Sequence, residues 1–442
     1  MVASRYNFYT DEFELKNSGY ILNVNTGSIL GIPDKAVWDS LLQGGVEDID
    51  SETKNVLFEN GIIAKSHKEE FEGIFERRTK WENSTKKIQV TIIPTDSCNF
   101  ACPYCFCYEK AGNFMTEETL KRMLELIEKR INNTEDVKQV QINWFGGEPT
   151  LAFNKIVFFM KKLTGICDNE NVEIFSTMTT NGYLLDKSMF EELIKNRVNN
   201  VQFTIDGAKK AHDDLRYLKN GEATFDRIWN NLSEISKIDK SIEFKLDVRC
   251  NFTKKNLESV KKFIDEYIKE FGDDERFGIY CRPVYKYDTK DNQIDEMDGE
   301  LFDPKEGLEI QNDLAQFIHS YDNERHHNRI FNPLPQPVDG WCNSEIANQI
   351  IVGPGGEIYT CETLTGLENS LGIIYDEKSE NEWPSIRYNI FEDERTRKCM
   401  ECRLLPLCMG GCLRNRLKSN ASCFWDESTI QESLKKYIAM YI

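Results

Sequence analysis

The sequence lacks any apolar run long enough to span a membrane. In 442 residues, no apolar stretch approaches the ~20 that cross a bilayer as a helix. The first residues, MVASRYNFYTDEFELK, also lack a basic segment followed by an apolar one. We therefore expect no secretory signal, and we predict a soluble cytoplasmic protein without membrane attachment.

Positive charge is also in deficit. Lys and Arg number 55 against 74 Asp and Glu, which gives a net charge of −19 at pH 7. The field around such a chain repels polyanions and argues against nucleic-acid binding. The acidic residues are spread along the chain, so solubility is the simpler reason for them. A partner peptide with a basic segment is the alternative. No internal repeat or low-complexity tract is present.

Cysteine, by contrast, is abundant, with 14 residues. Disulfides are rare in the reducing cytosol, so clustered cysteines there indicate metal ligands or catalytic groups. One cluster falls within residues 98–107 and a second within 342–423. Core packing explains the three scattered residues, Cys167, Cys250 and Cys281.

Residues 1–75 look like a small independent unit. Two short apolar runs flank Asn25-Thr26-Gly27, a hairpin signal. Helices are predicted from Lys35 to Leu42 and from about Ser51 to Asn60. The pattern predicts a winged-helix-like module, with a generic small β/α cap as the alternative. Residues 76–87 are predicted to be a linker.

Residues 88–284 alternate between strands and helices, which predicts parallel strands joined by right-handed crossovers. The predicted fold class is thus α/β, a partial barrel of six β/α units, with residues 285–340 as a connector that contains a helix near 306–321. Polar residues at the carboxyl ends of such strands build the site. The expected strands are 88–94, 140–145, 172–178, 201–205, 242–248 and 277–284, and the expected helices are 116–132, 154–167, 187–195, 224–235 and 257–271.

A cysteine loop follows the first of these strands directly. Cys98-x3-Cys102-x2-Cys105 can bring three thiolates to one face of a loop, and such soft ligands select iron–sulfur clusters, zinc or copper(I). Three ligands leave one iron of a four-iron cluster free. The alternative is a zinc site completed by Cys107 or a histidine.

With this loop, the sequence resembles the radical S-adenosylmethionine (SAM) superfamily, whose usual aromatic residue is present as Tyr104. The segment Gly146-Gly147-Glu148 is similar to the family's GGE motif, which the resemblance assigns to the SAM amino group. Arg216 and Arg249 are candidates for the SAM carboxylate, because an arginine fork pairs a carboxylate bidentately; salt bridges are the alternative. Further positions that match the SAM pocket of related enzymes are Thr180, Asn181, Thr204 and Asp206.

The second cysteine cluster, in residues 341–442, resembles the SPASM domain of peptide-modifying radical SAM enzymes. The resemblance implies two auxiliary [4Fe-4S] clusters, hence three clusters in all. It assigns Cys342, Cys361 and Cys412 to the proximal cluster. An eighth cysteine, present in some relatives, is missing here, so we expect an open iron on that cluster. Zinc ribbons or disulfides are the alternative. The distal cluster would be held by Cys399, Cys402, Cys408 and Cys423.

The resemblance implies an enzyme that cleaves SAM to a 5′-deoxyadenosyl radical and abstracts hydrogen from a peptide. Residues 1–75 resemble, more loosely, the leader-binding module of maturases that act on ribosomally made peptides. We therefore expect a sactisynthase- or ranthipeptide-synthase-like maturase that forms a Cys thioether in a precursor peptide, with a flavodoxin or ferredoxin as reductant. A carbon–carbon cross-link, an anaerobic sulfatase-maturing activity and a non-catalytic electron carrier are the alternatives. Asp206, Glu362 and the tyrosines are unranked possible bases.

Overall fold

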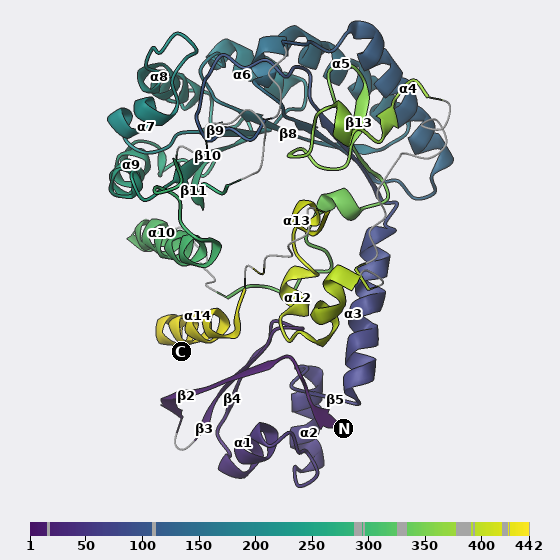
Figure 1. Ribbon diagram of the computed structural model, residues 1–442, viewed down its shortest axis with the longest axis vertical. Coiled ribbons are helices and arrows are strands. Elements are labelled where there is room, and N and C mark those ends of the chain that lie inside the picture. The colour runs from purple at the N-terminus through teal and green to yellow at the C-terminus, as the bar shows by residue number, and fades with distance from the viewer. Residues whose placement is uncertain are drawn as a thin grey trace. The chain divides into compact units, whose positions relative to one another are not determined.

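The structure, a computed structural model, describes residues 1–15, 18–107, 112–286, 294, 297–324, 334–376, 390–391, 394–417, 423 and 425–441. The chain forms two units (Figure 1). One unit combines Met1–Ser84, Ile330–Ile346 and Arg387–Ile442, and the other combines Thr85–Arg329 and Ala347–Ile386. The chain is therefore not divided linearly, and the predicted C-terminal domain, 341–442, contributes to both units.

A mostly parallel sheet forms the centre of the second unit. Its strand order is β11-β10-β9-β8-β7-β6-β12-β13-β14. All neighbours from β11 to β12 pair in parallel, whereas β13 and β14 are antiparallel additions. The strands are β6 (Lys87–Ile92), β7 (Gln139–Trp144), β8 (Glu173–Thr180), β9 (Asn200–Thr204), β10 (Lys245–Phe252), β11 (Phe277–Pro283), β12 (Gln349–Val352), β13 (Glu357–Tyr359) and β14 (Gly372–Ile373).

Helices alternate with these strands and lie along the outer side of the curved sheet in Figure 1. Polar caps set where several begin: Thr116 accepts a bond from the Thr119 amide, and Asp186 one from that of Met189. The helices are α4 (Glu117–Asn133), α5 (Phe153–Asn169), α6 (Lys187–Lys195), α7 (Lys209–Leu215), α8 (Phe225–Ile235), α9 (Leu257–Phe271) and α10 (Pro304–Glu324).

The predicted α/β architecture with parallel strands is confirmed. β6 shows why the sequence revealed it: Ile88, Val90 and Ile92 on one face are fully buried. Gln89 and Thr91 on the other face are buried too, as expected for a strand covered on both faces. The elements that the sequence analysis missed include α7 and β12. Helix α7 is only seven residues long and mostly polar, and β12 is only four residues long, too short for an alternating pattern to show.

The first unit begins with two small sheets. β1 (Val2–Ala3) pairs with β5 (Ile63–Ala64), and β2 (Asn7–Leu15), β3 (Ser18–Asn23) and β4 (Ile29–Ile32) form an antiparallel sheet in that order. The predicted hairpin is β3–β4. Helices α1 (Lys35–Leu42) and α2 (Ser51–Glu59) follow, each capped by an aspartate.

The prediction that residues 76–87 form a linker is wrong. Its first part belongs to helix α3 (His67–Glu82), and its last residue begins β6. The charged composition of the stretch suggested a linker, but Ser66 caps the helix and Ile74 is buried, so a narrow apolar face suffices to hold it.

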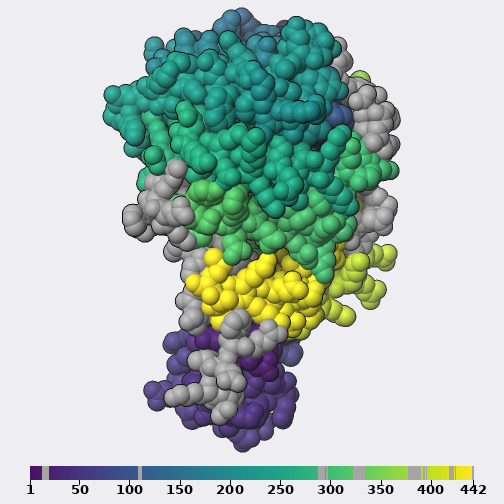
Figure 2. All heavy atoms as spheres, turned by 90° about the vertical axis from the view of Figure 1, so that its left-hand side faces the viewer, coloured from purple at the N-terminus to yellow at the C-terminus, as the bar shows by residue number. Residues whose placement is uncertain are grey.

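C-terminal elements complete the core of the first unit. Figure 2 shows α14 (Glu427–Tyr441) in yellow against the purple N-terminal strands. Ile430 and Leu434 of α14 share one apolar cluster with Phe8 and Leu22. Short helices contain Cys399 and Cys408 and directly adjoin Cys342, Cys402 and Cys412. These helices are η3 (Asn343–Glu345), η5 (Glu394–Glu401), α12 (Leu405–Cys408) and α13 (Leu413–Leu417).

Among the described residues, no helix combines the length and the apolar composition needed to cross a bilayer.

Candidate functional site

A cavity of about 240 Å³ opens at the carboxyl ends of the parallel strands. Loops after β6 and β7 and the ends of β8 to β11 supply its walls. Asp206, although predicted, lies behind this wall and is fully buried. The predicted residues that do line the cavity are Cys98, Cys102, Tyr104, Cys105, Gly146, Gly147, Glu148, Thr180, Asn181, Thr204, Arg216 and Arg249.

The glycine pair is clamped onto the start of the cysteine loop. The amide of Gly147 donates to Thr95 O at 3.1 Å, and that of Glu148 donates to Ser97 O at 2.8 Å. A Cβ on Gly147 would lie 2.2 Å from Ser97 O, far inside van der Waals contact. Gly146 has a φ of +130°, which side chains rarely adopt. Glycine is needed here so that the two loops can meet.

Glu148 joins the ends of β7 and β8. Its carboxylate is buried and accepts four hydrogen bonds: from the Thr150 amide (3.0 Å) and hydroxyl (2.6 Å), the Thr180 hydroxyl (2.6 Å) and the Asn181 amide (2.7 Å). Burial raises the pKa of Glu148, and these donors oppose the rise. The carboxylate therefore fixes Thr180 and Asn181 at the cavity.

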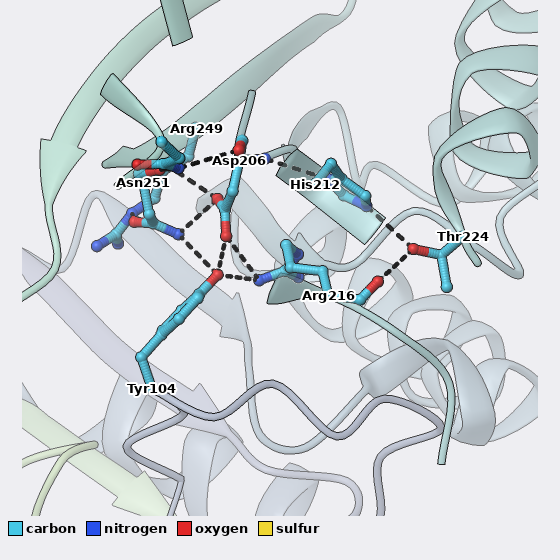
Figure 3. A network of polar contacts seen from close by, with 8 residues as sticks. Tyr104, Asp206, His212, Arg216, Thr224, Arg249 and Asn251 are labelled. Atoms are coloured by element: carbon cyan, nitrogen blue, oxygen red, sulfur yellow. Dashed lines mark hydrogen bonds and ion pairs between the residues drawn. The ribbon is translucent and has the colours of Figure 1, made fainter. Parts of the chain in front are cut away.

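A polar network joins the cysteine loop to β9 and β10 (Figure 3). The Tyr104 hydroxyl donates to Asp206 Oδ2 and accepts a bond from Arg216 at 2.7 Å. Asp206 Oδ1 accepts from the amide and side chain of Asn251 at 3.0 and 3.1 Å. Burial raises the pKa of Asp206, while the charge of Arg216 opposes the rise.

The two predicted arginines differ in their surroundings. Arg216 is almost buried, lies 3.9 Å from Asp206 Oδ2 and packs over the Phe100 ring. Arg249 is half-buried on β10, and its Nε donates to Asn251 at 2.8 Å. Arg216 therefore stabilises the pocket wall through an internal ion pair, whereas Arg249 is the better placed of the two for a carboxylate in the cavity.

The three thiols of the cysteine loop lie near one another. Burial raises the pKa of Cys102 to about 12, with Arg216 opposing the rise and Cys105 and Cys98 adding to it. Among the described residues, no three His, Cys, Asp or Glu side chains lie close enough to hold a single metal ion. A cluster needs no such contact, because each thiolate binds a different iron, and the soft donor set suits iron–sulfur chemistry.

The C-terminal cysteines lie in both units. Burial raises the pKa of Cys408 to about 12, and the charges of Cys399, Cys402 and Cys423 add to it, so these four thiols lie near one another. Burial also raises the pKa of Cys342, with Glu345 and Cys412 contributing. Cys361 belongs to the other unit, where its neighbours Glu362 and Thr363 line the cavity.

Sequence reasoning missed several residues of the cavity wall. Asn251 follows Arg249 by two positions and so shares its face of β10. The predicted strand stopped at Val248, but β10 continues to Phe252. Had the alternation of inward and outward side chains been extended past Val248, it would have placed Asn251 on the face of Arg249. Gln202 lies inside the predicted strand 201–205, two residues before Thr204 and on the same face of β9, so the alternation already placed it beside the predicted residue. The further wall residues include Phe106, Pro283, Val284 and Tyr285.

This combination of a cysteine loop, a glycine clamp and polar strand ends belongs to a known class. Residues 92–267 match the profile of the Radical SAM superfamily, so this segment is a radical SAM domain and the chain is an enzyme. The resemblance of this segment to the superfamily, inferred from the sequence, is thereby confirmed.

Three relatives with curated names are similar to most of this chain. The chain is 25% identical to a cysteine-type anaerobic sulfatase-maturating enzyme of Clostridium novyi, over 75% of this chain and 89% of the relative. It is 26% identical to a serine-type enzyme of Bacteroides thetaiotaomicron, over 78% and 87%. It is 23% identical to the radical SAM cyclopropyl synthase TigE of Paramaledivibacter caminithermalis, over 81% and 75%.

Solved structures share the fold. SuiB of Streptococcus suis bound to the precursor peptide SuiA has a TM-score of 0.51 and 17% identity, covering 98% of this chain and all of that one. Native anSMEcpe with bound AdoMet and a Cp18Cys peptide has a TM-score of 0.54 and 22% identity, covering 80% and 96%.

Proposed function

We propose that this enzyme modifies a ribosomally made precursor peptide and forms an intrapeptide cross-link, most specifically a thioether at a cysteine. The observation that carries the proposal is a cavity that brings three loop thiols together with the polar ends of the parallel strands. Peptides named with the solved relatives, SuiA and Cp18Cys, support a peptide substrate.

The bound cofactors would supply one-electron cleavage of SAM and a 5′-deoxyadenosyl radical. The chain's own residues bind and orient. Cys98, Cys102 and Cys105 would hold the cluster. The bonds from the Gly147 and Glu148 amides to the carbonyl oxygens before this loop fix its position against the end of β7. Arg249 would pair the SAM carboxylate. Apolar side chains around the pocket, among them Phe100 and Phe145, exclude water.

We further propose two auxiliary clusters in a SPASM-type arrangement. The proximity of Cys399, Cys402, Cys408 and Cys423 supports a fully ligated distal cluster. The interaction of Cys342 with Cys412 supports their assignment to the proximal cluster, for which Cys361 would be the third ligand. Three ligands leave one iron for a substrate thiolate, which favours a thioether product. The peptide would lose a hydrogen atom, a proton and one electron, the last passing to an auxiliary cluster.

The first unit would recognise the peptide's leader. Its three-stranded sheet has β2 and β4 as outer strands, and an extended leader can add a strand to such an edge. This is the winged-helix-like role expected for residues 1–75. A flavodoxin or ferredoxin would deliver the electron, and a cytoplasmic location would keep the thiols reduced.

A second candidate is formylglycine formation, favoured by the likeness to the two sulfatase-maturating enzymes. Product mass separates the alternatives. A thioether or a carbon–carbon cross-link removes two hydrogens from the peptide, whereas formylglycine made from cysteine also loses sulfur. Alkylation of free thiols then distinguishes the two cross-links, because only the thioether consumes a cysteine.

The experiment that tests the proposal measures iron and sulfide per chain after anaerobic reconstitution, together with 5′-deoxyadenosine release from SAM. About twelve iron in the whole protein, falling to about eight in Cys98/Cys102/Cys105→Ala with loss of SAM cleavage, supports three four-iron clusters. About four iron in the whole protein would contradict the auxiliary clusters. SAM cleavage that survives the triple substitution would contradict the assignment of the loop.

A further inference from the structure

A chain of hydrogen bonds connects the two ends of the segment that carries Asp206 and Arg216. The Asp206 amide donates to His212 Nδ1 at 3.1 Å, and His212 Nε2 lies 3.0 Å from the Thr224 hydroxyl. That hydroxyl donates to the carbonyl oxygen of Arg216. Figure 3 shows His212 between Asp206 on one side and Thr224 on the other.

The partners fix the protonation state of the imidazole. A backbone amide can only donate, so Nδ1 must carry a lone pair and no proton. In a neutral ring the proton is then on Nε2, where it donates to Thr224 and leaves the hydroxyl proton for Arg216. His212 is fully buried, and both burial and the charge of Arg216 hold its pKa well below the ordinary value.

Further bonds anchor the start of this segment: the Ala208 amide donates to Ser259 Oγ at 3.0 Å, and the carbonyl oxygen of Asp206 accepts a bond from Asn256 at 3.0 Å. At the start of α7, Ala208 offers no side-chain cap, and at its end Arg216 leaves helical geometry with a φ of −132°. Thr224, in turn, is held at the start of α8, because Asp213 accepts bonds from the amides of Thr224 and Phe225, both at 2.9 Å. Because Asp213 belongs to α7, these bonds join α7 to the start of α8 and keep the Thr224 hydroxyl where it braces His212.

We propose that His212 and Thr224 are positioning residues for SAM. They act through Asp206 and Arg216, which hold the Tyr104 hydroxyl at the rear of the SAM cavity. Without the brace, the segment between these two residues shifts, the Tyr104 ring loses its anchor, and the pocket no longer matches SAM. This inference rests on SAM binding in the cavity but not on the identity of the peptide.

The test compares SAM affinity among reconstituted holoenzymes by anaerobic equilibrium dialysis, with iron content as a check on loading. Thr224→Val keeps the shape and removes the hydroxyl, and we expect it to weaken SAM binding about three- to tenfold. Thr224→Ser keeps the hydroxyl and should bind within about twofold of the parent. His212→Asn keeps an acceptor for the Asp206 amide but cannot reach Thr224, so it should resemble Thr224→Val.

Thr429→Val provides the control, since it removes a buried hydroxyl bonded to Asp426 in the other unit. It should leave SAM affinity unchanged. The proposal is overturned if Thr224→Val loses thermal stability but binds SAM as tightly as the parent. It is also overturned if Thr224→Ser binds SAM as weakly as Thr224→Val. Failure of the proposed function appears separately, as a parent enzyme that binds SAM and modifies no peptide.

Discussion

Glu148 and Thr180 belong to neighbouring parallel strands, and the hydroxyl of Thr180 donates to Glu148 Oε1 at 2.6 Å. Each of the carboxylate's partners is a donor, and two of them are backbone amides that cannot reverse their role. The side chain at position 148 must therefore accept hydrogen bonds and donate none, as an ionised carboxylate does, although burial opposes its charge.

Glu148→Gln should lower the free energy of unfolding by about 1–3 kcal/mol, because an amide N–H must then face another N–H. SAM binding should fall with it, since Thr180 and Asn181 lose their anchor. Urea unfolding of the unreconstituted protein measures the first effect. Glu258→Gln, on the exposed side of α9, should stay within about 0.5 kcal/mol of the parent. Equal stability of the two variants would contradict the role given to Glu148.

Gly147→Ala should displace the cysteine loop. The new methyl group meets Ser97 O at 2.2 Å and Asp96 O at 2.5 Å, and both are backbone atoms that move only with the loop. We expect about four iron to be lost per chain, with loss of SAM cleavage, while the far-ultraviolet circular dichroism spectrum is kept.

Gly165→Ala is the matched control, because this exposed glycine lies inside α5 with no atom within 4 Å of the added methyl group. Alanine should there raise stability by about 0.5–1 kcal/mol and leave iron content unchanged. Full iron loading in Gly147→Ala would show that the loop tolerates the shift.

Much of the site was visible in the sequence because parallel strands bring their carboxyl ends to one edge. Gly146-Gly147-Glu148 and the pair Thr180-Asn181 needed only the strand assignment to be placed together, and the cavity lining agrees. The predicted bounds of α1, α6 and α9 also hold, since each helix has a clear apolar face, and an aspartate caps the first two.

Other features depend on contacts that no local pattern encodes. That Asp206 lies behind the pocket wall follows from its bonds to Tyr104 and Asn251, which are far away in the chain. The pairing of β12 with β6 joins residues more than 250 positions apart, so periodicity in either segment says nothing of it. The mixing of N- and C-terminal segments in the first unit has the same origin.

The buried His212 makes stability depend on pH. The unfolded chain takes up a proton on this histidine below about pH 6.5, whereas the folded protein, whose His212 pKa lies well below that value, does not. The free energy of unfolding should therefore fall as the pH drops from about 6.5 toward the folded-state pKa, by up to about 1.4 kcal/mol per pH unit.

His212→Asn isolates this contribution, because it lacks the titrating group. Urea unfolding of both proteins between pH 5 and pH 7.5 should give curves that converge as the pH falls. Buried Asp206 and Glu148 have raised pKa values and act in the opposite sense, but they are common to both proteins. A constant difference between the curves would show that the pKa of His212 is the same in the folded and the unfolded chain.

In the first unit, Glu345 lies between two buried arginines. Its Oε1 is 2.9 Å from Arg78 NH2 of α3 and also accepts a bond from Arg416 of α13. Glu82 binds the Nε of Arg78. Removing Glu345 takes the fully buried carboxylate away from both guanidinium groups and leaves the partly exposed Glu82 beside Arg78, which is far costlier than losing an exposed ion pair.

Glu345→Ala should therefore lower the free energy of unfolding of this unit by about 3–5 kcal/mol. Asp39→Ala, which breaks the exposed pair with Lys35, should cost less than about 1 kcal/mol. Replacing Arg78, Glu345 and Arg416 together by methionine removes all three charges and should recover most of the loss. Hydrogen exchange of the α3 amides reports the stability of this unit directly. If the α3 amides of Glu345→Ala are as well protected from exchange as those of Asp39→Ala, then water reaches the two arginines. If the triple methionine variant is as unstable as Glu345→Ala, then lost packing, rather than the buried positive charge, causes the loss of stability.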